Sequence, residues 1–220
     1  TQIKYSMIEL INKLEKKRTL TLDEYETLIV NRNEEYARIL AEKALAAKQR
    51  IYKNAVFIRG LIEISSYCKN DCLYCGIRRS NRNCERYRLT KEQILSCCDE
   101  GYRLGFRTFV MQGGEDAYFT DDVICGIVSE IKKRYPDCAV TLSLGERSYE
   151  SYKRLYDAGA DRYLLRHETA DEEHYLKLHP SSMSFQTRMN ALKDLKEILE
   201  QYSNPVKIKI KEKRLGKKGE

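Results

Sequence analysis

The 220-residue sequence predicts an α/β fold of about four strand–loop–helix units, preceded by N-terminal helices. Short runs rich in Val, Ile, Leu and Phe alternate with longer segments whose apolar residues recur at helical spacing. This alternation favours a parallel sheet with right-handed crossovers. Polar and Gly-rich stretches follow the expected strands, at the edge that carries active sites in barrels and open α/β sheets.

Three helices are expected at the N-terminus. Residues 2–16 carry apolar side chains at helical spacing, and residues 33–52 are rich in Ala, Glu, Leu and Lys. Between them, Thr21 begins a helix, because Glu24 three residues later completes a capping box. We therefore expect an N-terminal helical segment over residues 1–53.

From residue 54 onward, strands and helices alternate. Thr90 caps the first of these helices, whereas Pro136 and Gly159 mark the ends of later ones. We expect a β/α domain over residues 54–203. The expected strands are residues 55–65, 107–112, 138–143 and 161–166, and the expected helices are residues 91–104, 121–135, 148–158 and 183–201.

The net charge of +7 is concentrated near the C-terminus, where residues 206–220 carry +5. We expect residues 204–220 to form a basic, disordered tail, and nucleic acid is not an expected partner. No apolar run reaches the length of a membrane span. The first residues lack a basic segment followed by an apolar one, so we expect a cytoplasmic protein without a membrane partner.

Three of the eight cysteines stand close together. Cys68, Cys72 and Cys75 form a C-x3-C-x2-C group, with the aromatic Tyr74 directly before the last thiol. Three thiolates hold three irons of a [4Fe–4S] cube and leave the fourth iron open for chemistry. The other cysteines are expected to be small core or surface residues rather than disulfides, namely Cys84, Cys97, Cys98, Cys125 and Cys138.

The spacing of the cysteines alone is also compatible with a zinc site or with a coincidental stripe on a helix. Zinc takes a fourth ligand, however, no second C-x2-C pair exists and the three His lie far along the chain. A helix would set the outer thiols about 10 Å apart along its axis, too far for one cube. Asn70, Asp71 and Gly76 favour a loop instead.

An open iron can be chelated by the amino and carboxylate groups of S-adenosylmethionine. One electron from the cluster then cleaves the sulfonium C–S bond, which gives methionine and a 5′-deoxyadenosyl radical. The protein must supply acceptors for the ammonium, a cation for the carboxylate and polar partners for the ribose. Gly113, Gly114 and Glu115 follow the second strand, and Ser143 and Gly145 follow the third.

Charged residues follow the fourth strand. Arg166, His167 and Glu168 end it, and Arg188 lies on the next helix. A salt-bridged rim, a structural histidine and a solvated arginine are ordinary roles for such residues. A plain strand-to-helix turn likewise accounts for the Gly-Gly pair.

Several stretches together resemble the radical SAM superfamily and, within it, the HydE family of [FeFe]-hydrogenase maturases. The similarity covers about residues 1–196. Biotin synthases and methylornithine synthases are relatives, and an enzyme of that kind or an inactive metal-binding remnant are the alternatives. The stretches are residues 57–64, 68–80, 85–90, 101–110, 112–116, 141–149 and 163–170.

The resemblance implies a (β/α)8 barrel, here partial, in an enzyme that assembles the H-cluster of [FeFe]-hydrogenase. The implied partners are S-adenosylmethionine, a small iron–carbonyl–cyanide precursor and other hydrogenase maturation proteins. Because four strands are visible, we expect an N-terminal fragment of such an enzyme. The implied cluster ligands are Cys68, Cys72 and Cys75, the implied S-adenosylmethionine-binding residues are Tyr74, Gly113, Gly114, Glu115, Ser143, Glu168 and Arg188, and the implied catalytic residues in the barrel interior are Thr141 and Arg166.

Overall fold

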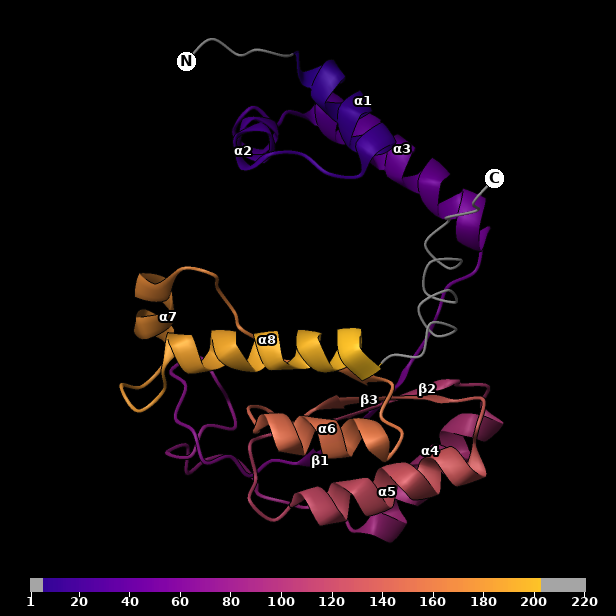
Figure 1. Ribbon diagram of the computed structural model, residues 1–220, viewed down its shortest axis with the longest axis vertical. Coiled ribbons are helices and arrows are strands. Elements are labelled where there is room, and N and C mark those ends of the chain that lie inside the picture. Colours follow the sequence, from indigo (N-terminus) through magenta and orange to yellow (C-terminus); the bar gives the residue numbers. More distant parts are fainter. Residues whose placement is uncertain (1–5, 203–220) are drawn as a thin grey trace. The chain divides into compact units, whose positions relative to one another are not determined.

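The computed structural model describes residues 6–202 and divides into two compact units, which meet in the chain between Phe57 and Ile58 (Figure 1). The first unit is helical, and the second contains all the strands of the described residues. The predicted basic tail, residues 204–220, lies outside the described residues.

Three helices make the first unit. Its short core of aliphatic side chains lies between them, and the predicted capping box of Thr21 and Glu24 is confirmed, since each side chain accepts from the other residue's backbone N–H. The helices are α1 (Met7–Lys17), α2 (Leu22–Val30) and α3 (Glu34–Tyr52). The buried core residues are Leu10, Ile11, Leu20 and Leu28.

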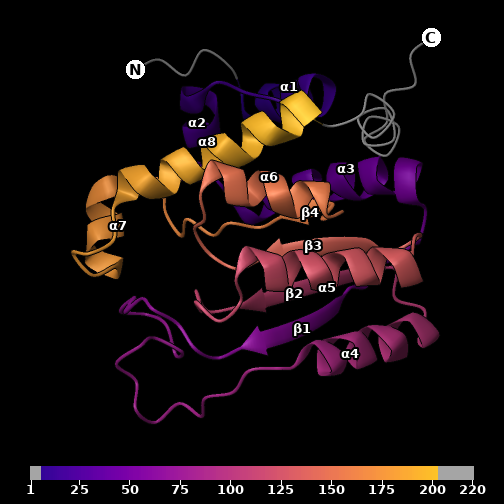
Figure 2. The same ribbon diagram turned by 60° about the horizontal axis from the view of Figure 1, so that its bottom comes forward.

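A parallel sheet with strand order β1-β2-β3-β4 organises the second unit (Figure 2). A helix lies between each strand and the next, as the alternation in the sequence predicts. The strands are β1 (Gly60–Ser65), β2 (Thr108–Gly113), β3 (Ala139–Ser143) and β4 (Arg162–Tyr163), and the helices are α4 (Lys91–Arg103), α5 (Asp121–Arg134), α6 (Tyr149–Asp157), α7 (Glu172–Leu178) and α8 (Phe185–Tyr202).

Two predicted strands are too long. The first begins at Gly60 rather than at residue 55, because its pairing with β2 starts at Phe109. The fourth, predicted over residues 161–166, forms a ladder only at Arg162–Tyr163, and its last backbone bond to β3 is from Leu164 N to Leu142 O at 2.8 Å. Helix α7 was not predicted, since its seven residues are too few for a clear period.

The two faces of the sheet differ in polarity. One face packs against α4, α5 and α6 through fully buried side chains such as Ile64, Met111 and Leu142. On the other face, Leu61 and Glu63 of β1 are exposed, and Gln112 of β2 is half-buried. Alternation along the strands thus separates an apolar core from an open, partly polar face.

None of the helices in residues 6–202 combines the length and the apolar character that a membrane span requires.

Candidate functional site

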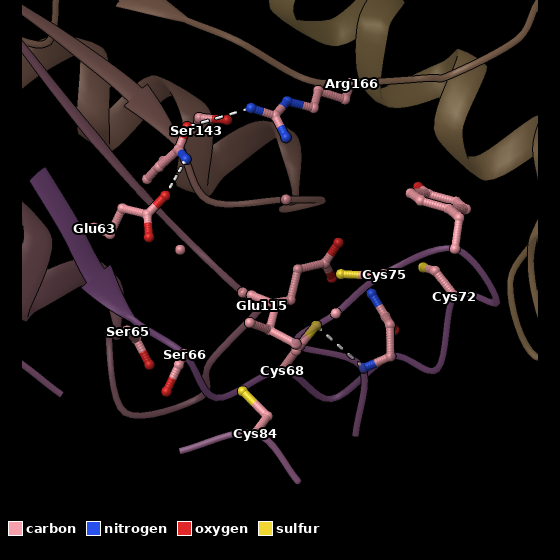
Figure 3. Close-up of a pocket in the computed structure, with 18 of the residues that line it drawn as sticks. Glu63, Ser65, Ser66, Cys68, Cys72, Cys75, Cys84, Glu115, Ser143 and Arg166 are labelled. Carbon is pink, nitrogen blue, oxygen red and sulfur yellow. Dashed lines mark hydrogen bonds between the residues drawn. The ribbon is translucent and has the colours of Figure 1, made fainter. Parts of the chain in front are cut away.

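The three clustered cysteines lie in an irregular loop directly after β1, here called the cysteine loop (residues 66–82). No helix forms there, as predicted, and the chain curls so that Cys75 N donates to Cys72 O at 3.1 Å. Cys68, Cys72 and Cys75 are half-buried free thiols. Figure 3 shows them on one side of a cavity beside Glu115. The thiols are therefore neither strung along a helix nor sealed in a core.

The thiols are close enough to affect one another's charge. Burial, followed by the proximity of Cys68 and Cys75, raises the pKa of the Cys72 thiol to about 11. A metal centre would reverse this effect, because it binds the thiolate. Within residues 6–202, no three His, Cys, Asp or Glu side chains surround a position for a single metal ion.

Arg86 closes the cysteine loop, a role that the sequence did not predict. Its guanidinium donates to the carbonyl oxygens of Ile77 at 2.9 Å, Arg78 at 2.7 Å and Asn81 at 3.1 Å, and also to that of Ser66. The acceptors lie on both sides of the three cysteines. A planar group with five donors suits this task, which a lysine ammonium cannot perform in the same way.

Gly114 allows the turn after β2 to touch the cysteine loop. A Cβ at this position would lie 2.1 Å from Tyr67 O and 2.7 Å from Cys68 Cβ. The contact is fixed by Lys69 N, which donates to Glu115 O at 3.0 Å. Glycine is thus required at residue 114 because the backbone comes this close to Tyr67 and to Cys68, the first of the three cysteines.

The carboxylate of Glu115 is buried among cations and backbone donors. Lys69 Nζ lies 3.0 Å from Oε2, and the guanidinium of Arg188 lies 3.7 Å from Oε1. Glu146 N donates to Oε1 at 3.1 Å. Gly145 has φ +78° and lies so close that a Cβ there would be 1.9 Å from Glu115 Cγ. Two glycine-bearing loops therefore form a narrow cradle around this carboxylate.

Arg188 is a buried cation rather than a solvated one, with only 7% of its surface exposed. Its Nε donates to Glu146 Oε1 at 2.5 Å, and its guanidinium also donates to Arg166 O. Burial works against the charge of Arg188, but ion pairing with Glu146 outweighs burial and raises its pKa. Glu146 was not predicted as a site residue, because no local pattern distinguishes it from other acidic loop residues.

An open cavity of about 580 Å³ collects nearly all of the predicted site residues. Thr141 is the exception, since it is buried on β3 two residues before Ser143 and does not line the cavity. His167, which follows the fourth strand but was not assigned to the site, does not line the cavity. The predicted residues that line the cavity are Cys68, Cys72, Tyr74, Cys75, Gly113, Gly114, Glu115, Ser143, Gly145, Arg166, Glu168 and Arg188.

Glu168 has a strained backbone. Its φ of +63° lies in the left-handed region, which a glutamate rarely adopts. Among the described residues of the second unit, no other non-glycine residue has a positive φ. An exposed, strained residue at a cavity wall points to a functional constraint.

A polar chain crosses the open face of the sheet. Gln112 donates through Nε2 to Glu63 Oε1 at 2.8 Å and accepts at Oε1 from Arg166 at 3.3 Å (Figure 3). All three side chains line the cavity. The amide of Gln112 thus separates the Glu63 carboxylate from the Arg166 guanidinium. Of these three residues, only Arg166 was predicted as a site residue.

His179 contacts Tyr74 through a hydrogen bond and an edge-on ring contact. Its Nδ1 lies 2.9 Å from Tyr175 O, and because a carbonyl only accepts, Nδ1 carries the proton. In neutral His179, Nε2 then accepts from the Tyr74 hydroxyl at 3.3 Å. The Tyr175 ring stacks on the imidazole with centroids 3.8 Å apart. This histidine, more than a hundred residues from Tyr74, carries no sequence signal of its role.

Comparisons with known proteins agree with this site. The radical SAM superfamily profile matches residues 62–209. The chain is 43% identical to the [FeFe] hydrogenase maturase subunit HydE of Thermotoga maritima, over 86% of this chain and 53% of that protein. It is 29% identical to the 3-methylornithine synthase of Methanosarcina acetivorans, over 81% and 51% of the two chains.

Solved structures are also similar. Methylornithine synthase (PylB) matches with a TM-score of 0.75 and 28% identity, over 86% of this chain and 56% of that one. HydG, a maturase of the [FeFe]-hydrogenase, matches with a TM-score of 0.78 and 26% identity, over 87% and 44%. The chain spans about half the length of the curated relatives it matches.

The chain belongs to the radical SAM superfamily. Membership confirms the predicted fold class, a partial β/α barrel, and makes the chain an enzyme by family. It also confirms the predicted cofactors, a [4Fe–4S] cluster and S-adenosylmethionine. The residues fit these groups, since three free thiols face a glycine cradle that a single Cβ would fill.

Substituting Gly114→Ala is expected to reduce iron uptake to less than about half, because the new methyl displaces the backbone beside Cys68. Iron and sulfide per chain after anaerobic reconstitution measure this effect. Gly76→Ala is the matched control, since a Cβ at Gly76 meets no atom within 4 Å. Full iron content in Gly114→Ala would show that the contact is dispensable.

Substituting Arg86→Lys is expected to speed the loss of iron to a chelator, because the loop loses several hydrogen bonds worth about 1 kcal/mol each. The half-life of cluster absorbance in excess chelator reports this change. Arg82→Lys serves as the control on the same loop. Equal half-lives for the two variants would remove the proposed role of Arg86.

Substituting Glu168→Gly is expected to raise the free energy of unfolding by about 1 kcal/mol, because glycine relieves the left-handed strain. The same change is expected to weaken binding of S-adenosylmethionine at least about tenfold, since a charge-assisted hydrogen bond is lost. Denaturant titration and calorimetry measure the two effects. A variant with unchanged affinity would argue against a ligand role for Glu168.

Proposed function

We propose that this chain carries the cluster-binding and S-adenosylmethionine-binding part of a maturase that acts in assembly of the [FeFe]-hydrogenase H-cluster. The observation that carries the proposal is the meeting of three thiols, a Gly-Gly-Glu turn and a buried arginine at one cavity. Identity of 43% to a HydE subunit supports the choice of reaction within the superfamily.

When bound, the cluster and S-adenosylmethionine supply one-electron cleavage of a sulfonium C–S bond. In this proposal, Cys68, Cys72 and Cys75 hold three irons and leave one iron open.

The turn after β2 is proposed to receive the methionyl ammonium, with Glu115 and the carbonyls of Gly113 and Gly114 as acceptors. Arg188 is the cation for the methionyl carboxylate, and it already holds a carboxylate in the structure, that of Glu146. Ser143 and Glu168 line the same cavity and offer oxygen atoms to the ligand hydroxyls.

Tyr74 is proposed to contact the remainder of S-adenosylmethionine with an aromatic ring that His179 orients. Such an orienting bond is a common device for holding an aromatic side chain that would otherwise rotate. Support for this role comes from the position of Tyr74 in the cavity wall.

The substrate is proposed to be a small iron–carbonyl–cyanide precursor. Arg166 supplies a positive charge on the open face of the sheet, which suits an anionic guest, and Thr141 lies deeper on β3 as the second proposed catalytic residue. Other hydrogenase maturation proteins are the proposed partners, and the cytoplasm is the proposed location.

A second candidate function is a radical SAM enzyme that acts on an amino acid, like the methylornithine synthases. The observation that favours it is the polar chain on the open face, where Glu63 suits an ammonium and Arg166 suits a carboxylate. Both groups are present on any free amino acid. The 29% identity to 3-methylornithine synthase agrees with this candidate.

Anaerobic reconstitution of the whole chain with iron and sulfide tests the shared chemistry. We expect a brown cluster and, with dithionite and S-adenosylmethionine, formation of 5′-deoxyadenosine and methionine, measured by mass spectrometry. Cys72→Ala should abolish both products, whereas Cys97→Ala, at an exposed thiol outside the site, should leave them unchanged. Absence of product from wild-type chain would favour an inactive metal-binding remnant.

The same assay separates the two candidates. Addition of a synthetic iron–carbonyl–cyanide complex should increase 5′-deoxyadenosine formation if the chain is a maturase. Stimulation by a mixture of free amino acids instead, with no effect of the iron complex, would support the amino-acid enzyme.

A further inference from the structure

Positive charge is concentrated around the cysteine loop. Residues 67–88 contain six Lys and Arg against two Asp and Glu, a net charge of +4. Residues 6–202 together contain 32 Lys and Arg against 31 Asp and Glu. The rest of the described chain is therefore slightly acidic, and the basic surface belongs to one segment that surrounds the three cysteines.

Half of these cations already have strong partners. Lys69 pairs with Glu115, and Arg88 binds Asp116 through two bonds of 2.7 and 2.9 Å. Arg86 is occupied by the loop carbonyls. These three residues hold the local structure and leave little charge for an external ligand.

The other three cations have no carboxylate partner, although Arg78 is half-buried and donates to Cys75 O at 3.4 Å. No Asp or Glu side chain of residues 6–202 lies within 4 Å of the charged groups of Arg78, Arg79 or Arg82. Arg79 and Arg82 are exposed, and Arg79 N is bonded to Asn70 O at 2.9 Å, directly beside the cysteines. These positive charges therefore lie on the cysteine loop itself, close to the three cysteines.

An apolar tip lies on the same loop. Leu73, between the second and third cysteines, is 64% exposed, and the neighbouring Tyr74 is 50% exposed. Leu73 N donates to Leu178 O at 2.9 Å, so the tip is held by its backbone. Apolar side chains beside exposed arginines are typical of a protein–protein interface, where Arg and Tyr are enriched.

We propose that Leu73, Arg78, Arg79 and Arg82 form the docking surface for an acidic one-electron carrier protein. This proposal rests on the proposed function, because S-adenosylmethionine cleavage consumes one electron that this chain does not itself supply. A carrier docked here would bring its redox centre next to the cluster ligands, and electron transfer slows steeply with distance.

The step is balanced as a single electron transfer. A plant-type ferredoxin gives up one electron, so its [2Fe–2S] cluster goes from the reduced to the oxidised form. The [4Fe–4S] cluster of this chain takes up that electron and falls in charge from 2+ to 1+. No proton or group is transferred. Complementary charge would accelerate the encounter, and salt would weaken it.

The test compares a protein donor with a small one on the reconstituted whole chain. Stopped-flow bleaching of the cluster absorbance gives the second-order rate constant for reduction by an acidic plant-type ferredoxin and, separately, by reduced methyl viologen, a small cation. We expect the double variant Arg79→Glu/Arg82→Glu to slow the ferredoxin reaction at least about tenfold at low salt. The rate constant for reduction by viologen, the iron content and the electron paramagnetic resonance spectrum should be the same as in the unchanged chain.

Further variants sharpen the result. Arg79→Gln/Arg82→Gln removes the charge without reversing it and should give an intermediate rate. Arg162→Glu reverses a single exposed charge at the amino end of β4, at the opposite end of the strands, and should leave the ferredoxin rate near that of the unchanged chain. Its matched loop variant is Arg79→Glu alone, which should slow the ferredoxin reaction. The salt dependence of the rate should be lost only in the loop variants.

Several outcomes would contradict the proposed docking surface. One is an unchanged ferredoxin rate in the charge-reversal variant, and another is an equal fall with viologen, which would mean that the cluster itself is disturbed. A loop that binds a single-stranded RNA oligomer but not ferredoxin would indicate a nucleic-acid surface instead. If the unchanged chain takes up no cluster, the proposed function fails and the docking surface with it.

Discussion

The contact between Gly114 and the backbone of Tyr67 and Cys68 is the constraint on which the candidate site depends. It joins the turn after β2 to the loop after β1, so a thiol and a carboxylate from different strand ends come together. The parallel sheet makes this possible, because all its strands end at the same edge. A side chain of any size at residue 114 would separate the two loops.

Electrostatics then fixes the positions of the charged side chains. Glu115 and Glu146 share one buried arginine, Arg188, which reaches them from α8. Burying a cation is costly unless carboxylates and carbonyls surround it, and here both are present. The last helix of the second unit is thereby tied to the loops after β2 and β3.

The sequence predicted those features whose cause is local. Helix starts such as Thr21 and Thr90 follow from capping patterns within four residues, and the C-x3-C-x2-C group is a single short motif. Strand ends were less predictable: residues 55–58 are apolar, but no neighbouring strand pairs with them, so no ladder forms there. Arg86, Glu146 and His179 were missed because their partners are set by the tertiary fold. The limits of the two units and the individual ligand roles stay predictions.

The amide of Gln112 has its orientation fixed from both sides. Glu63 requires the amino group to point toward β1, and Arg166 requires the oxygen to point toward the segment after β4. The open face of the sheet is therefore polarised in one direction only. A guest that carries separated positive and negative charges therefore has a single favourable way to lie across this face, with its cation toward Glu63 and its anion toward Arg166.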